Sequence, residues 1–495
     1  MSATRKPIWR RHWLCIGVVL LLALLGWYRF LREVPSEYSV GQYNDDALKY
    51  GTIGVETTVT GGFPLDIWHV LPDVFPEYLP SSGGEDGYAA FGFIQEAGND
   101  LPVGLSRTYR GLDLVGLNCA LCHAGSYRMD FDKPRVVVPG APAITQDPQA
   151  YLRFLFQCGQ DPRFDAATLI PAVRKRRPNL RLDEELVLRA FIPLVKAGLN
   201  QQANQLAWMD RNPSWGPGRI DPFNPIKFGI LRRPLDQSIG NADMMPLWDL
   251  GNRARQGTRL HWDGLNGSIR EVLDSSALGD GASTRTMDTE RMDQLEEYLK
   301  QLKPPKYPGV IDKAAANRGK KIFEANCYVC HGDRGARTGM VISLAFDPAD
   351  ESDRRIATDP ERVFMWDQAA ADAYNRYGSG YRWQMYDFEN HEGYVAVPLT
   401  GLWMRGPYLH NGSVPTLWHL LNPDERPATF YRGCDVLDLQ RVGFVWSEDQ
   451  IRQDGGRSFF LYDTRHQGNG NRGHHYGSEL EPSEKKDLIE YLKQL

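Results

Sequence analysis

The chain has 495 residues, of which 42% are hydrophobic and 24% are charged, and these values are typical of a globular protein. They exclude disorder, collagen and a coiled coil as descriptions of the whole chain, and the length predicts roughly two or three domains. Lys and Arg total 57 against 62 Asp and Glu, for a net charge of −5. No excess of positive charge marks a nucleic-acid-binding surface, so we expect no nucleic acid among the partners.

The first predicted element is an apolar run, residues 13–31, with basic residues on both sides. A membrane span needs about 20 apolar residues, which this run reaches only with its last two residues included. More basic residues precede the run than follow it, so the positive-inside rule predicts a cytoplasmic stub at 1–12 and a main body in the periplasm. No small-residue cleavage site follows, which favours an uncleaved signal anchor in the inner membrane over a removed signal peptide or a buried core helix.

Residues 32–95 are rich in Gly, Pro and aromatic side chains and show no sustained hydrophobic period. Solvated linkers carry fewer aromatic residues than this segment does. The composition therefore predicts an irregular extension that packs on the first domain.

The hexapeptide Glu-Tyr-Leu-Lys-Gln-Leu occurs twice, at 297–302 and at 490–495, each time at the end of an amphipathic helical pattern. Ser483 is the expected N-cap of the second of these helices. A proline-rich stretch follows the first one and is typical of a linker. The pattern predicts two related units, residues 96–304 and residues 305–495.

The sequence C-x-x-C-H, the signature of covalent attachment of c-type haem, occurs once in each unit. Its members are Cys119, Cys122 and His123 in the first unit and Cys327, Cys330 and His331 in the second. Two thiols on one turn reach the two vinyl groups of a porphyrin, and the adjacent imidazole then lies beneath the iron as its proximal ligand. We therefore expect two covalently bound haems.

Other roles for paired cysteines explain the sequence less well. Zinc sites and redox or structural disulfides also use C-x-x-C pairs, but neither accounts for a histidine directly after both pairs. The remaining cysteines are Cys15, in the apolar run, and Cys158 and Cys434. The last two would either form a disulfide between the units or stay as buried thiols.

The sixth ligand of each iron decides the chemistry, because an open position permits peroxide or oxygen chemistry and a second protein ligand makes an electron-transfer haem. His474 lies in a Gly/Asn-rich loop just before the last helix, from which a ligand could reach a haem in the same unit. We expect His474 to be the distal ligand of the second haem. His410, Met404 and His475 are the alternatives.

Longer segments around these residues carry a family resemblance. They are GFPLDIWHVLPDVFP, LPVGLSRTYRGLDLVGLNCALCHAG, GPGRIDPFN, LHWDGLNGSIRE, ANCYVCHG, ATDPERVFMW, VPLTGLWMRGPYLHNGSVPTLWHLL and GNGNRGHHYGSEL. In these segments the chain resembles the bacterial di-haem cytochrome c peroxidase superfamily, and within it the branch of the di-haem rubber oxygenases. HWDG and PYLHNGS are the most specific parts of the match.

The resemblance implies a mainly α fold of two cytochrome c-like domains with long loop insertions, here preceded by a single transmembrane helix. It places Trp262 close to the active haem and places His474 where the family's second haem finds its distal ligand. Glu271 is a candidate acid–base group for O–O cleavage, although several residues after HWDG differ from the family pattern. Arg219 and Asp221 would form either an internal ion pair or contacts to haem propionates.

The expected function is that of a membrane-anchored periplasmic di-haem oxidoreductase. It would reduce hydrogen peroxide at the N-terminal haem with electrons delivered through the C-terminal haem. The electron donor would be a small cytochrome, a copper protein or the quinol chain. An oxygenase that uses O2 on an organic, alkene-like substrate and a non-catalytic electron-transfer cytochrome are the alternatives, and calcium between the domains is left open.

Overall fold

The structure is a computed structural model, and it describes residues 16–21, 23–26, 28, 33–34, 37–39, 41–53, 62–80, 87–344, 356–451 and 459–495. Among these residues no helix is both long enough and apolar enough to cross a bilayer. This finding overturns the predicted anchor at 13–31 and, with it, the predicted inner-membrane location. The helical residues described there fall short of the roughly 20 that a span requires. The predicted stub at 1–12 and residues 13–15, with Cys15, lie outside the described residues.

Helices, short 3-10 and π turns included, make up about 43% of the described residues, and most of them are α-helices. In chain order they are α2 (Asp45–Tyr50), α3 (Leu65–Val74), α4 (Ala120–His123), α5 (Pro148–Gln160), α6 (Ala166–Arg176), α7 (Leu182–Gln205), α8 (Leu250–Arg255), α9 (Ile269–Gly279), α10 (Thr289–Gln301), α11 (Lys313–Asn326), α12 (Tyr328–His331), α13 (Glu361–Phe364), α14 (Gln368–Tyr377), α15 (Leu417–Leu421), α16 (Glu448–Ile451) and α17 (Pro482–Leu492).

Short strands connect the helices. They are β1 (Glu33–Val34), β2 (Phe63–Pro64), β3 (Leu105–Arg110), β4 (Asp113–Leu117), β5 (Ala124–Tyr127), β6 (Val136–Pro139), β7 (Arg219–Ile220), β8 (Ala242–Asp243), β9 (Val341–Ser343), β10 (Gly393–Val395), β11 (Thr429–Arg432), β12 (Leu437–Asp438), β13 (Gly443–Phe444) and β14 (Phe460–Asp463). They form one four-stranded sheet, in the order β1-β3-β4-β2, and five two-stranded ladders in the described part of the chain. The predicted fold, mainly α with a single membrane helix, was therefore wrong. The described residues form helices joined by segments with small β ladders, and none of these helices could span a membrane.

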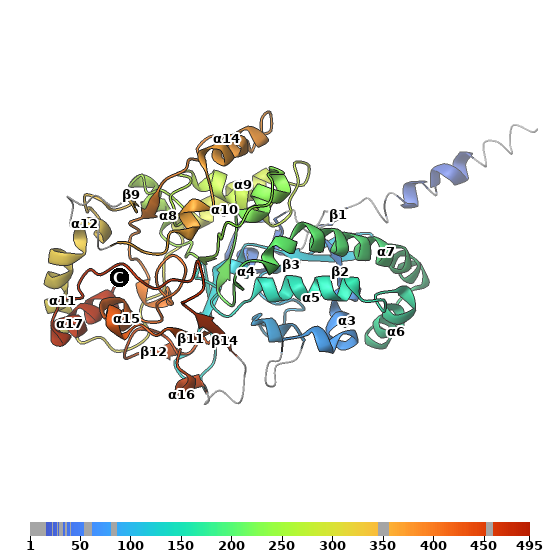
Figure 1. The fold of residues 1–495 in the computed structure, drawn as a ribbon. Coiled ribbons are helices and arrows are strands. Elements are labelled where there is room, and N and C mark those ends of the chain that lie inside the picture. The colour runs from blue at the N-terminus through green and yellow to red at the C-terminus, as the bar shows by residue number, and fades with distance from the viewer. Residues whose placement is uncertain are drawn as a thin grey trace, which may run out of the picture.

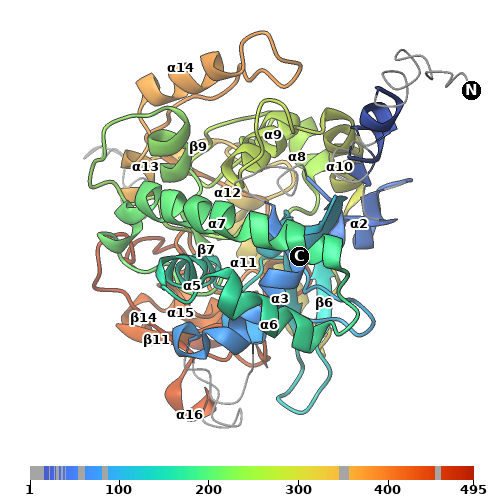
Figure 2. The same ribbon diagram turned by 90° about the vertical axis from the view of Figure 1, so that its right-hand side faces the viewer.

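The N-terminal half forms one end of the molecule, where α3, α5, α6 and α7 pack beside the four-stranded sheet (Figures 1 and 2). The segment expected to be irregular contributes α3 to this end and also forms α2, whose buried residues pack with those of α8, α9 and α10. Successive turns of α3 bury Trp68 and Leu71 in an aromatic core, where Trp68 stacks on Tyr88 at 3.7 Å between ring centroids. The internal Pro72 hid this helix, because proline usually interrupts a helical pattern.

The opposite end is built on α11 and α17, which cross closely (Figure 1). Gly319 lies at the crossing, where an added Cβ would come within 1.9 Å of the carbonyl oxygen of Asp487. The two repeated hexapeptides begin near the ends of α10 and α17. The expected N-cap Ser483 is wrong, because α17 begins at Pro482 and is capped by Glu481 in a capping box with Glu484.

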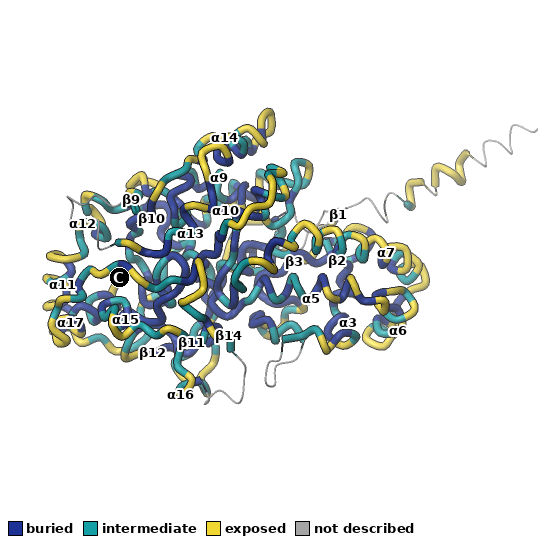
Figure 3. The backbone as a smooth tube through the Cα atoms, in the orientation of Figure 1, coloured by how far each residue is buried: buried dark blue, intermediate teal, exposed yellow. Residues whose placement is uncertain are grey.

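Buried backbone runs through the middle of the molecule and joins the two ends (Figure 3). One hydrophobic cluster combines Phe223 and Leu278 from the first predicted unit with Trp366 and Phe388 from the second. Contacts across the predicted boundary at 305 are therefore extensive, and the two-unit division stays a prediction.

Candidate haem-binding sites

The first C-x-x-C-H motif folds into the single helical turn α4. Cys119 is its N-cap, and the Cys119 carbonyl accepts hydrogen bonds from the backbone of Cys122 at 3.2 Å and of His123 at 3.0 Å. Asn118 supports the start of the turn, because its Oδ1 accepts from the Ala120 amide at 2.9 Å. The motif therefore presents both thiols and the imidazole from one turn.

The second motif repeats this geometry in α12. The Cys327 carbonyl accepts from the backbone of Cys330 at 3.2 Å and of His331 at 2.9 Å. Helix α11 runs directly into this turn, and the Cys327 amide closes its last turn by donating to the Phe323 carbonyl. Two copies of one local structure thus lie in different parts of the fold.

Each motif histidine is oriented by a backbone carbonyl from a distant segment. His123 Nδ1 lies 2.8 Å from the Met245 carbonyl oxygen, and His331 Nδ1 lies 2.8 Å from the Val397 carbonyl oxygen. A carbonyl only accepts hydrogen bonds, so each Nδ1 carries the proton and each Nε2 has a free lone pair. Histidines that bind metals are held in this way by their second nitrogen.

Burial keeps both imidazoles neutral. It lowers the pKa of His123 to about 4, and it also lowers the pKa of His331. A neutral imidazole is the form that binds a metal ion. The donor set therefore fits an axial ligand of a haem iron at each motif.

The thiols do not resemble those of a redox centre. Burial raises the pKa of Cys327 to about 12 and raises those of Cys122 and Cys330, whereas a reactive dithiol needs a lowered thiol pKa. No group of three or more His, Cys, Asp and Glu suited to a metal ion occurs among the described residues. The four cysteines of the two motifs therefore do not form a zinc site in that part of the chain.

His474 lies against the second motif. Its ring centroid is 6.2 Å from that of His331, with the rings tilted by 41°. Two imidazole nitrogens that share one metal ion lie about 4 Å apart, since each bond is roughly 2.0–2.1 Å long, and the centroid separation is compatible with that spacing. His474 Nδ1 is buried without a hydrogen-bond partner in the described structure.

The backbone of His474 is held in an unusual conformation to reach this place. Its φ of +50° is in the left-handed region, which is unfavourable for a residue with a side chain. The His474 amide donates to the Ile356 carbonyl at 2.9 Å and fixes the loop. Such strain is typical of functional positions.

The three alternative ligands lie elsewhere. His410 stacks on Tyr394 at 3.9 Å between centroids, and its Nε2 is 3.0 Å from the Tyr394 hydroxyl. Met404 is buried in the hydrophobic cluster of the C-terminal end. His475 is exposed. Of the four candidates, only His474 has a ring contact with His331 in the described residues.

Trp262 lies between the segments that orient the two motif histidines. Its Nε1 donates to the Asp243 carbonyl at 2.8 Å, two residues before the Met245 carbonyl that holds His123. Its own carbonyl accepts from the Val395 amide at 2.8 Å, two residues before the Val397 carbonyl that holds His331. A short path of backbone and hydrogen bonds therefore passes through Trp262 from one motif to the other.

Glu271 lies in the first turn of α9 and joins two loops. Its Oε2 accepts from Asn266 Nδ2 at 2.9 Å and from the amides of Tyr386 and Asp387 at 3.1 and 3.0 Å. One carboxylate oxygen is thus occupied by structural hydrogen bonds.

Arg219 and Asp221 do not form the ion pair that the sequence left open. Asp221 accepts from the amides of Asn224 and Gly240 and from the Asn224 side chain. Arg219 is fully buried, and its Nε and Nη2 have no partner in the described part of the chain. Its strand, β7, pairs with β8, directly before the Met245 segment that holds His123.

His261 is a residue that the sequence reasoning missed. Its φ is +63°, and its Nε2 is buried without a partner in the described structure. Burial first, and then the charges of Arg362 and His123, lower its pKa to about 3. The available signal was a histidine directly before Trp262 in the HWDG segment.

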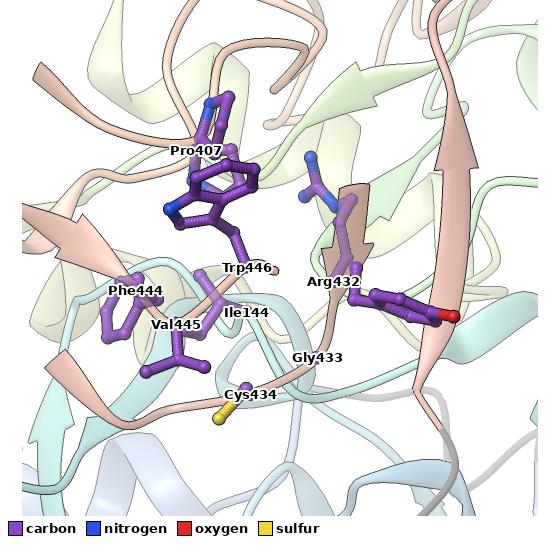
Figure 4. A pocket seen from close by; sticks show the side chains of 10 residues that line it. Ile144, Pro407, Arg432, Gly433, Cys434, Phe444, Val445 and Trp446 are labelled. Carbon is purple, nitrogen blue, oxygen red and sulfur yellow. The ribbon is translucent and has the colours of Figure 1, made fainter. Parts of the chain in front are cut away.

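The alternative disulfide is not formed, because Cys158 is a buried free thiol. Cys434 lines a hollow with Ile144, Pro407 and Trp446 (Figure 4). This hollow has a volume of about 10 Å³, enough for about one water molecule. It is too small to bind an organic substrate.

Comparisons with known proteins agree with this chemistry at a coarse level. Residues 393–431 match the family described as RoxA-like, cytochrome c-like, and this range includes the Val397 carbonyl that orients His331. The chain is 26% identical over 564 residues to the uncharacterized protein y4iJ of Sinorhizobium fredii, which covers 88% of this chain and 89% of that protein. It is 30% identical over 239 residues to y4iM of the same organism, which covers 40% of this chain and 52% of that protein. The match supports a cytochrome c-like protein with a c-type haem and a redox function.

Proposed function

We propose that the chain is a di-haem c-type oxidoreductase that reduces hydrogen peroxide. Cys119 and Cys122 would hold the first haem, with His123 as its proximal ligand. Cys327 and Cys330 would hold the second, with His331 and His474 as its two axial ligands. Bound haem would supply electron transfer and the cleavage of the O–O bond.

The difference between the two motifs carries this proposal. His331 has a second imidazole at 6.2 Å, whereas none of the ring contacts of the described residues involves His123. The ring of His261, whose pKa is lowered by burial and by the charges of Arg362 and His123, contacts Phe223 and Phe388 and has no ring contact with His123 in the described residues. The arrangement supports one haem with two protein ligands, suited to electron transfer, and one with an open position, suited to peroxide.

Trp262, Glu271 and Arg219 would serve electron transfer, acid–base chemistry and haem binding. Trp262 would lie on the electron path between the haems, and electrons would come from a small cytochrome, a copper protein or the quinol chain. Glu271 would act as the acid–base group through Oε1, since Oε2 already accepts three hydrogen bonds. Arg219 would bind a propionate of the first haem with its unpartnered nitrogens.

The first experiment combines haem content and spin state. A pyridine haemochrome assay should find two haems per chain, and electron paramagnetic resonance of the ferric protein should show one high-spin and one low-spin centre. His474→Gly should convert the low-spin centre to high spin, and added imidazole should restore it. Two low-spin centres in the parent protein would instead establish a pure electron-transfer cytochrome.

A second candidate, an oxygenase of an alkene-like substrate, is favoured by the RoxA-like description of the match at 393–431. Peroxide-dependent oxidation of a reduced cytochrome supports the peroxidase, and oxygen uptake with alkenes supports the oxygenase. Glu271→Gln tests the acid–base role in either case. General acid–base catalysis contributes about 10²–10⁴-fold to a rate, so a loss of that size is expected, whereas an unchanged rate would exclude the role.

A further inference from the structure

Arg253, on α8, has a buried positive charge with no anionic partner. Its side chain is only 2% exposed, and its Nε and Nη2 have no hydrogen-bond partner in the described residues. Burial lowers its pKa to about 10. An unpaired buried guanidinium costs several kcal/mol, so a fold that retains one normally supplies an anion.

Arg405 is a second buried guanidinium in the same region. It is 8% exposed, and its Nη1 and Nη2 donate to neutral acceptors: the Pro398 carbonyl at 2.9 Å, the Thr400 hydroxyl at 3.1 Å and the Thr400 carbonyl. Its Nε has no partner in the part of the chain that is described. Burial, and after it the charge of Arg253, holds the pKa of Arg405 well below its usual value.

The protein itself supplies little negative charge there. The charge of Asp249 acts on the pKa of both guanidinium groups. Asp249 already forms an ion pair with Lys303 at 2.8 Å. Two buried cations therefore share a region in which the nearby carboxylate is committed elsewhere.

This region adjoins the second C-x-x-C-H motif. Arg405 donates to the Pro398 carbonyl, directly after the Val397 carbonyl that holds His331. Trp248, just before α8, donates from Nε1 to the Thr400 carbonyl at 2.8 Å, which ties the Arg253 helix to the Arg405 loop. The hydroxyl of Thr258, three residues beyond α8, is another buried group without a partner in the described structure.

We propose that Arg253 and Arg405 form the binding site for the propionate carboxylates of the haem attached at Cys327 and Cys330. Guanidinium groups bind carboxylates through paired N–H donors. Within the described residues Arg253 keeps such a pair, Nε and Nη2, without a partner, and Arg405 keeps its Nε. This inference rests on the proposed function, because it requires a haem at the second motif. It adds a recognition site on a segment outside both attachment motifs.

Reduction potentials test the site in the intact, haem-loaded protein. Removing a cation near the iron favours the more positive ferric state, so Arg253→Gln and Arg405→Gln should each lower the potential of the six-coordinate haem. We expect about a tenfold change in its reduction equilibrium, which corresponds to about 59 mV for one electron. The potential of the other haem should stay unchanged.

Two further variants separate this effect from general damage. Arg255→Gln removes an exposed charge from the same helix and should leave both potentials unchanged. Arg253→Lys keeps the charge but loses the planar pair of donors, so it should restore most of the potential. If Arg253 had a purely structural role, the potential would not fall in Arg253→Gln, recover in Arg253→Lys and stay unchanged in Arg255→Gln.

The haem content of the variants and of the parent protein shows whether the propionate site alone or the proposed function as well is refuted. If Arg253→Gln and Arg405→Gln retain two haems and unchanged potentials, the propionate site is refuted and the proposed function stands. If the parent protein carries no haem at Cys327 and Cys330, both are refuted.

Discussion

The crossing of α11 and α17 is sensitive to a single methyl group. An added Cβ at Gly319 would lie 1.9 Å from the Asp487 oxygen, 2.5 Å from its carbonyl carbon and 2.9 Å from the Leu488 nitrogen. All three atoms belong to helix backbone, which cannot rotate away as a side chain could. Since ordinary contact begins at 3.4 Å, Gly319→Ala requires α17 to retreat by about 1.5 Å.

The expected cost follows from two opposing effects. Overpacking of a core costs about 1–3 kcal/mol, and alanine in place of a helical glycine returns about 0.5–1 kcal/mol. Gly319→Ala should therefore lower the free energy of unfolding by about 1–2 kcal/mol. In the proposed di-haem form the variant should also retain less haem at Cys327 and Cys330, because Cys327 is the C-cap of α11.

Urea denaturation of the haem-loaded protein measures this effect, with Gly198→Ala as the matched control. Gly198 is also in a helix, but its added Cβ would meet nothing within 4 Å. The control should raise the urea midpoint slightly, whereas Gly319→Ala should lower it. Equal midpoints for the two variants would refute the close crossing of α11 and α17.

Two further predictions concern buried charges. Arg362 lies 3.2 Å from Asp263, and both side chains are almost fully buried. Arg362→Met should therefore lower the free energy of unfolding measured in urea by about 3–5 kcal/mol. If adding Asp263→Asn to this variant restores none of the lost stability, the pairing is wrong. Burial alone would raise the pKa of Asp435, but the charges of Arg135 and Arg128 hold it below its usual value. The Asp435 carboxylate therefore contributes its full stabilisation of the folded state above about pH 4. This stabilisation is lost as the pH falls through the lowered pKa of the folded state. Asp435→Asn should cost about 1.5–3 kcal/mol at neutral pH and weaken the acid-induced loss of stability, which urea midpoints measured across the acid range would detect.

Two predictions that each depend on a short stretch of sequence agree with the structure. The two thiols and the imidazole of each motif were expected on one turn, and α4 and α12 form such turns. The helical patterns before the repeated hexapeptides were also found, because each depends on apolar spacing within one segment.

Long-range features were not accessible in this way. Nothing in the sequence indicates that the carbonyls of Met245 and Val397 orient the motif histidines, because a backbone carbonyl is the same in every residue type. The unpartnered Nε and Nη2 of Arg253 are equally invisible in the sequence, since they depend on which groups the described segments far along the chain bring near them. The predicted anchor at 13–31 was wrong for another reason, because hydropathy measures composition alone, and among the described residues no helix is long and apolar enough to span a membrane.

The hydrogen bonds around Trp262 give the two motifs a common dependence. The Asp243 carbonyl that accepts from its indole and the Met245 carbonyl that orients His123 belong to one segment, and the Val395 amide and the Val397 carbonyl belong to another. A displacement of Trp262 as a whole, backbone and indole together, would therefore act on both segments. This coupling is mechanical and does not require Trp262 to carry an electron. Trp262→Phe removes the bond to the Asp243 carbonyl and keeps the backbone bond to Val395, so it should disturb the ligand geometry at His123 more than at His331 even in a protein that never turns over.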